Sequence, residues 1–130
     1  MGTLSRMLRG SRLMTAIMHS IASPMVIGLA YHGTTPDKKR GLENIYGKHI
    51  NAKYFEEQLR FIVRNYRIIK QSDLVDCLVN RKPLPRKAVF ITFDDGYVGN
   101  YQVAFPLLKK YGLSATFFVP TAYVENGWLE

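Results

Sequence analysis

The stretch "VFITFDDGY", residues 89–97, places Asp94 and Asp95 side by side directly after an apolar run. The run, Ala88–Phe93, is rich in β-branched and aromatic residues, which is typical of a buried strand. Adjacent carboxylates repel each other, and neither is tolerated in a dry interior unless something compensates its charge. Gly96 allows the backbone to turn sharply away from the strand. The pattern therefore predicts a polar site where a buried strand ends.

The rest of the chain alternates short apolar runs with helical patterns. Strands are expected at 25–31, 67–69, 88–93 and 115–119, and helices at 52–66, 73–80 and 100–111. Asn51 and Ser72 are the expected N-caps, and Gly112 is the expected C-terminal stop. Pro106 must either kink its helix or sit in the first turn, and residues 32–50 are expected to form a loop. This alternation predicts an α/β fold with parallel strands.

Two motifs are expected on the same face of this fold, because functional groups gather at the carboxyl ends of parallel strands. Asp94 and Asp95 follow one strand, and Tyr31 and His32 follow another. One aspartate can coordinate a divalent metal, while the other takes a proton from a water molecule. The alternative is an ordinary turn, with one aspartate capping the next helix and the other solvated.

Other classes of site fit the motif less well. Dehalogenase-type phosphatases space their acids as D-x-D-G, whereas these acids are adjacent, and the chain contains no glycine-rich nucleotide-binding motif. The length of 130 residues suits one domain. The formal charge of +8 comes from basic residues spread along the chain, without a nucleic-acid-binding motif, so no nucleic-acid partner is expected. Solvated loops explain these charges, and a surface for anionic polymers or headgroups is the alternative. Cys77 is expected to be a buried, inert thiol.

Residues 1–22 combine basic side chains with a weakly apolar stretch, but without a convincing signal-peptide cleavage site. We expect a helix that is not cleaved and that either packs on the domain or lies on a membrane surface. The sequence thus favours a cytoplasmic or membrane-associated protein. A basic membrane-surface protein that uses this helix is a weaker functional hypothesis.

Four stretches together resemble the polysaccharide deacetylases, the NodB-homology family known as carbohydrate esterase family 4. "ITFDDGY" resembles the first motif of the family, T-F-D-D-G, and "LAYHG" resembles its opening strand. "FEEQLRFIVRNYRIIKQSDL" and "NYQVAFPLLKKYGLSATFFVPTAYV" resemble the helices and strands on either side of that motif. The resemblance covers residues 25–130 and implies a partial (β/α) barrel of the NodB type, preceded by the helix in 1–22.

The resemblance implies a metal-dependent hydrolase that removes N-acetyl groups from the amino sugars of a glycan. Asp94 corresponds to the catalytic base and Asp95 to a metal ligand, with Zn²⁺ as the expected ion. His32 and Tyr97 are expected to contact the substrate, although His32 could equally be a hydrogen-bonded loop histidine. No role is assigned to His19 or His49.

The chain departs from the family pattern in one respect. The family binds its metal with two further histidines in an H-[ST]-x-x-H-P motif, and this motif does not occur in the sequence. It is therefore expected to be the first part of a catalytic domain and to be inactive alone. A non-catalytic glycan-binding or scaffold remnant is the alternative. A partial barrel also leaves an open strand edge, and "ATFFV", 115–119, is the segment expected to drive aggregation.

Overall fold

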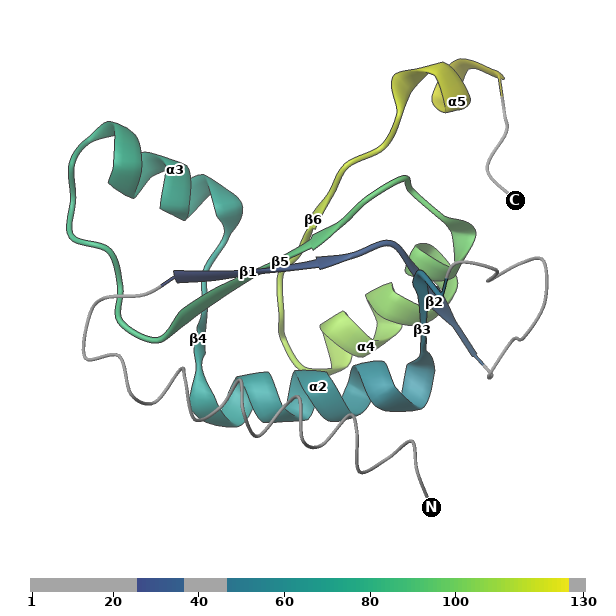
Figure 1. Ribbon diagram of the computed structural model, residues 1–130, viewed down its shortest axis with the longest axis horizontal. Coiled ribbons are helices and arrows are strands. Elements are labelled where there is room, and N and C mark those ends of the chain that lie inside the picture. Colours follow the sequence, from purple (N-terminus) through teal and green to yellow (C-terminus); the bar gives the residue numbers. More distant parts are fainter. Residues whose placement is uncertain (1–25, 37–46, 127–130) are drawn as a thin grey trace.

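A computed structural model describes residues 26–36 and 47–126 (Figure 1). The helix expected in residues 1–22 lies outside these ranges. Within them, none of the helices combines the length and the apolar character needed to cross a membrane.

The main sheet is parallel and is built around β5 (Ala88–Phe93). β1 (Val26–Tyr31) pairs along the whole of one edge of β5. The other edge is shared: β4 (Arg67–Ile68) pairs with the start of β5, and β6 (Thr116–Phe117) pairs with its end. The expected strands and their parallel arrangement are confirmed, although β4 and β6 are shorter than their apolar runs.

A second, two-stranded parallel sheet was not expected. It joins β2 (Gly33–Thr35) to β3 (His49–Asn51), so the prediction of a loop over residues 32–50 was wrong at both ends. Each strand has only three residues, and their pairing is set by contacts distant in the sequence, so neither leaves a clear local pattern. A Cβ at Gly33 would lie 2.8 Å from the His49 ring, so a larger residue there would require this ring to move.

The helix α2 (Ala52–Asn65) begins as predicted, because the Asn51 side chain accepts a hydrogen bond from the Lys53 N–H at 2.9 Å. The helix α3 (Gln71–Val79) does not begin at Ser72. Its N-cap is Lys70, whose N–H donates to the Asp73 carboxylate at 3.2 Å. The hydrogen-bond acceptor at the start of α3 is therefore the carboxylate of Asp73, in the first turn of the helix. Ser72 does not act as the N-cap.

The segment after the aspartate pair is helical in two parts. A π-helical segment, η2 (Asn100–Ala104), continues into α4 (Phe105–Lys110). Pro106 sits in the first turn of α4, where its missing N–H is tolerated, and Gly112 follows the helix at a φ of +64°. A short helix, α5 (Thr121–Asn126), comes after β6.

The core lies between the sheet and the pair of helices α2 and α4, which cover the same side of the sheet (Figure 1). Its centre is Phe93, which is fully buried and packs against Phe55 and Tyr31 with ring centroids 5.8 and 5.3 Å apart. The helix α3 lies on the opposite side and has no buried residue (Figure 1). Cys77 in α3 is half-buried, so the prediction of a buried thiol was wrong. The buried residues of the core are Phe55, Leu59, Ile62, Val89, Ile91, Phe93, Ala104 and Leu108.

Candidate functional site

The aspartate pair lies at the carboxyl end of the central strand. Asp94 directly follows β5, and its backbone N–H donates to the Tyr31 carbonyl oxygen at 2.8 Å. This bond continues the pairing of β1 with β5 by one residue, and both aspartates are half-buried. The end of β1, and with it His32, therefore lies beside the pair, as the parallel arrangement predicted.

The backbone turns abruptly after Asp94. Asp95 has a φ of +67° and Gly96 a φ of +66°, so two successive residues adopt the left-handed conformation. The expected role of Gly96 in this turn is thus confirmed. For a residue with a side chain this conformation costs about 1–2 kcal/mol, although aspartate tolerates it better than most. Such strain is typical of functional sites and is sustained by the surrounding packing.

The side chain of Tyr31, at the carboxyl end of β1, is held by two contacts with α2. Its hydroxyl donates to the Gln58 Oε1 at 2.7 Å, and its ring packs edge-on against Phe55 at 5.1 Å. Burial raises the pKa of the Tyr31 hydroxyl to about 12. Because Tyr31 is anchored to α2, it fixes the position of the residue that follows it, His32.

The two residues predicted to contact substrate are held at the same end. The His32 carbonyl oxygen accepts a hydrogen bond from the Asn100 Nδ2 at 2.8 Å. The Tyr97 carbonyl oxygen accepts one from the Asn100 backbone N–H, also at 2.8 Å. The Tyr97 ring meets the His49 ring edge-on, with centroids 4.6 Å apart and planes at 63°. His32 and Tyr97 are both half-buried.

His49, to which the sequence assigned no role, therefore belongs to this region. It reaches Tyr97 because β3 pairs with β2, and β2 directly follows His32. A second link holds these parts together, since the Thr34 Oγ1 donates to the Gly99 carbonyl oxygen at 2.6 Å. No local signal identified His49, because its contact depends on pairing between strands that are themselves hard to recognise.

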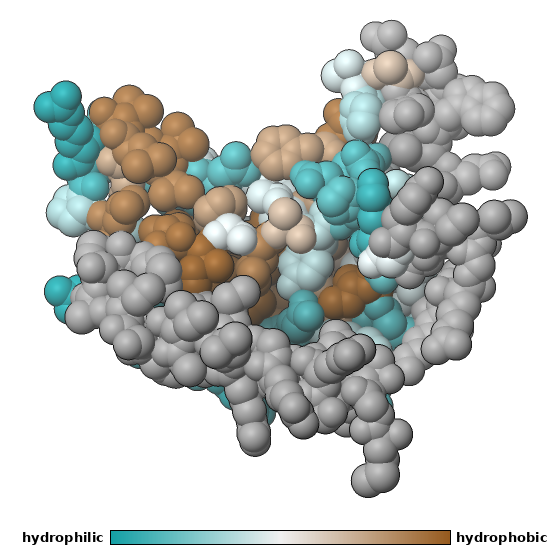
Figure 2. Space-filling model, in the orientation of Figure 1, coloured by the Kyte–Doolittle hydropathy of each residue, from teal (hydrophilic) through white to brown (hydrophobic). Residues whose placement is uncertain are grey.

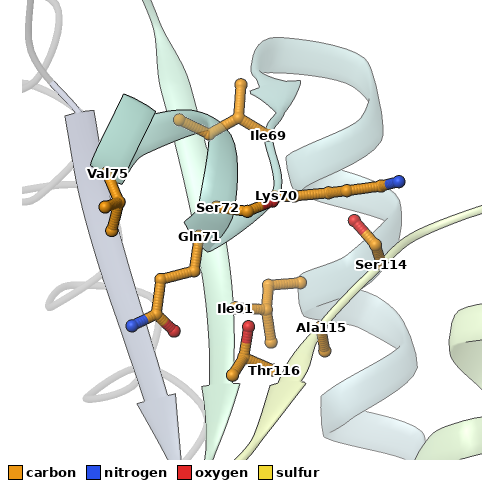
Figure 3. Close-up of a pocket in the computed structure, with 9 residues that line it drawn as sticks. All are labelled: Ile69, Lys70, Gln71, Ser72, Val75, Ile91, Ser114, Ala115 and Thr116. Atoms are coloured by element: carbon orange, nitrogen blue, oxygen red, sulfur yellow. The ribbon is translucent and has the colours of Figure 1, made fainter. Parts of the chain in front are cut away.

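A cavity of about 630 Å³ lies elsewhere, between the start of α3 and the edges of β5 and β6 (Figure 3). None of the candidate site residues lines it. It opens where β4 ends and β6 has not yet begun, so it results from the split edge of β5. The lining residues are Ile69, Lys70, Gln71, Ser72, Val75, Ile91, Ser114, Ala115 and Thr116.

The described residues do not make a complete metal site. They contain no group of three or more histidine, cysteine, aspartate or glutamate side chains that could hold a metal ion. A catalytic zinc usually takes three protein ligands. Asp94 and Asp95 alone therefore do not fit a catalytic zinc site.

Known proteins share both the sequence and the fold of this chain. A family profile described as "Polysaccharide deacetylase" matches residues 81–130. The Bacillus subtilis (strain 168) protein YxkH, a polysaccharide deacetylase by name, is 43% identical over 71 residues, which are 54% of this chain and 25% of YxkH. The poly-beta-1,6-N-acetyl-D-glucosamine N-deacetylase of Escherichia coli (strain K12) is 30% identical over 78 residues, which are 59% of this chain and 12% of that enzyme.

The solved structure of the Streptococcus pyogenes deacetylase PplD in complex with acetate matches with a TM-score of 0.67 and 31% identity. The match covers 81% of this chain and 47% of PplD. The chain thus spans a quarter or less of the curated relatives and about half of the solved chain. Deacetylases of this NodB type have a (β/α) barrel, and the parallel strands with their helices agree with part of one. In both sequence and fold, this chain is therefore similar to the polysaccharide deacetylases.

Proposed function

We propose that the protein removes N-acetyl groups from the amino sugars of a glycan and that Asp94 is its general base. The observation that carries this proposal is the aspartate pair at the carboxyl end of β5, beside the end of β1. The similarity to polysaccharide deacetylases in sequence and fold supports the reaction class. The name of the Escherichia coli relative supports the substrate class, since that enzyme acts on an N-acetylated glucosamine polymer.

The reaction is the hydrolysis of an amide bond. A water molecule adds to the acetyl carbonyl carbon while Asp94 accepts the proton that this water loses. The C–N bond then breaks, the nitrogen takes up a proton, and the products are acetate and a free amino sugar. Asp94 suits the role of base because it is half-buried and stands at the face where ligands gather in parallel α/β folds.

Substrate contacts are proposed for His32 and Tyr97. Both are half-buried and both lie at the same end as the aspartates. The ring of Tyr97, held against His49, offers an aromatic surface of the kind that packs against a sugar ring. Their hydrogen-bonded carbonyl groups keep these residues in fixed positions relative to the turn.

Asp95 is proposed as one ligand of a divalent cation, and Zn²⁺ is the ion expected from the family. Because the described residues lack a complete ligand set, the remaining ligands would have to come from outside residues 26–36 and 47–126. The same observation favours a second candidate function, a glycan-binding or scaffold protein without catalysis. A complete set of metal ligands is expected of a deacetylase and is not needed by a non-catalytic protein, so it separates the two functions.

The test measures acetate release from an N-acetylglucosamine oligomer by the polypeptide as it occurs in its source. We expect Asp94→Asn to lower the rate about 10²–10⁴-fold, the usual contribution of a general base, without weakening glycan binding. Asp76→Asn makes the same change on the exposed surface of α3 and should leave the rate unaltered.

Three outcomes are informative. A rate that survives in Asp94→Asn contradicts the role of Asp94. A loss in both variants indicates damage that is not specific to the site. If the unmodified protein binds the oligomer but releases no acetate, the non-catalytic alternative is correct.

A further inference from the structure

We infer that Asn100 is a positioning residue that locks the end of β1 to the turn carrying the aspartate pair, and so holds His32 and Tyr97 in register. Its catalytic consequence rests on the proposed deacetylation, whereas its structural consequence does not.

Asn100 bonds to both of the predicted substrate-binding residues. Its side-chain Nδ2 donates to the His32 carbonyl oxygen, and its backbone N–H donates to the Tyr97 carbonyl oxygen, both at 2.8 Å. The two acceptors lie 65 positions apart in the sequence, and α2, β4 and α3 come between them along the chain. A single residue thus connects the segment after β1 with the segment after β5.

The chemistry of the side chain indicates that the bond to His32 is the reason for an asparagine here. Asn100 is only 2% exposed, and its Oδ1 has no hydrogen-bond partner among the described residues. Burying an unpaired acceptor costs more than a typical hydrogen bond contributes. An apolar residue of similar size would avoid that cost, but it would leave the His32 carbonyl without its donor. The amide is therefore best explained by the bond that it makes to His32.

The backbone around Asn100 leaves little freedom to move. A Cβ at Gly99 would lie 1.9 Å from the Thr34 carbonyl oxygen, so the turn and β2 are in direct backbone contact. The Thr34 hydroxyl also bonds to the Gly99 carbonyl oxygen. Asn100 itself begins the π-helical segment η2, and π-helical turns occur often at functional sites.

The first experiment needs no catalysis and no substitution. We expect the Asn100 side-chain amide protons of the unmodified protein to exchange with solvent at least ten times more slowly than those of Asn80, whose bond to Asp76 is exposed. Equal exchange rates for the two side chains would overturn the inference.

The second experiment replaces the donor without changing the size of the side chain. Asn100→Asp removes the bond to His32 and places a carboxylate against a carbonyl oxygen. We expect the NMR signals of His32 and Tyr97 to shift, and kcat for acetate release to fall on the order of 100-fold with KM changed much less. Asn80→Asp makes the same change at the exposed end of α3, far from the site, and is the matched control, for which we expect no shift at His32.

The outcomes separate this inference from the proposed function. Unmoved His32 and Tyr97 signals in a folded Asn100→Asp variant would overturn it. If the signals move but the unmodified protein releases no acetate, the positioning role stands and the proposed deacetylation fails. If the signals move and kcat stays unaltered, Asn100 organises the site without supporting catalysis, which contradicts the catalytic part of the inference.

Discussion

Asp95 combines an unfavourable backbone conformation with a predicted chemical role. Its φ of +67° is one that glycine adopts without strain. We expect Asp95→Gly to leave the free energy of unfolding unchanged or to raise it by up to about 1 kcal/mol, because relief of strain outweighs the greater entropy of the unfolded chain. Acetate release should nevertheless be lost with the carboxylate. Urea unfolding and the acetate assay check the two halves.

Lys87 provides the control for this substitution. It also has a positive φ, +50°, but it lies before the start of β5, at the far end of the strand from the aspartates. Lys87→Gly should change stability in the same direction and leave activity intact. Undiminished activity in Asp95→Gly would show that its carboxylate is not needed.

Tyr31 makes the stability of the protein depend on pH in the alkaline range. Its pKa is raised from 10.0 to about 12 by burial, so between these values the unfolded chain loses a proton that the folded protein keeps. The contribution of Tyr31 is complete below pH 10 and is lost as the pH rises to about 12. At 1.36 kcal/mol per pKa unit, the loss is about 2–3 kcal/mol.

The measurement is the free energy of unfolding at pH 9 to 12 in the unmodified protein and in Tyr31→Phe. The variant should lose the Gln58 hydrogen bond, which lowers its stability at neutral pH, but it should show a shallower alkaline decline. Tyr101→Phe, at a residue 75% exposed, should decline like the unmodified protein. Parallel declines in all three would contradict the assignment to Tyr31.

At the scale of elements, the contact between β2 and the start of η2 is decided by Gly99. Because a Cβ there would lie 1.9 Å from a backbone oxygen of Thr34, Gly99→Ala forces the strand and the turn apart. We expect a loss of about 3 kcal/mol or more in the free energy of unfolding, at the upper end of the cost of overpacking. Urea unfolding measures it.

Gly112→Ala is the matched comparison. Gly112 has a φ of +64°, but no atom lies within 4 Å of the position where a Cβ would be added. Only backbone strain remains there, so the loss should be about 1–2 kcal/mol. A loss at Gly99 no larger than at Gly112 would mean that β2 and the turn can separate easily.

At the scale of the whole molecule, one side of the sheet is well covered and the other is not. The helices α2 and α4 cover the first side, whereas Gly28 and Ala30 of β1 remain exposed on the other in the part of the chain described here. Figure 2 shows hydrophobic side chains gathered over α3 on this side, where Leu78 and Val79 are 61% and 73% exposed. Surfaces of this kind promote association.

The exposed edge beside β6 should drive that association. Phe118 is 48% exposed, in the apolar segment that the sequence marked as prone to aggregate. We expect the 130-residue chain to bind a hydrophobic dye and to scatter more light as its concentration rises, and we expect Phe118→Lys to reduce both signals, since charges on an edge oppose pairing between molecules. Val63→Lys makes the same change at a residue 45% exposed on α2 and should have little effect. Equal effects of the two variants would contradict the role of the edge.

The sequence by itself determined the parallel α/β class, the position of the central strand and the placement of the aspartate pair. These features follow from local patterns: the apolar run Ala88–Phe93 can only be buried, and the polar residues that follow it must lie where the strand ends. The N-cap at Asn51 and the stop at Gly112 were predictable for the same reason, since one side chain or one backbone angle decides each of them.

Only the tertiary structure decided which distant segments meet at the site. The pairing of β2 with β3, the contact of His49 with Tyr97 and the bond from Asn100 to His32 join residues that are 16 to 68 positions apart. Such contacts depend on how the sheet brings chain segments together and leave no periodic pattern in the sequence. The aspartates could therefore be found by reading the chain, whereas the residues that hold them in place required the fold.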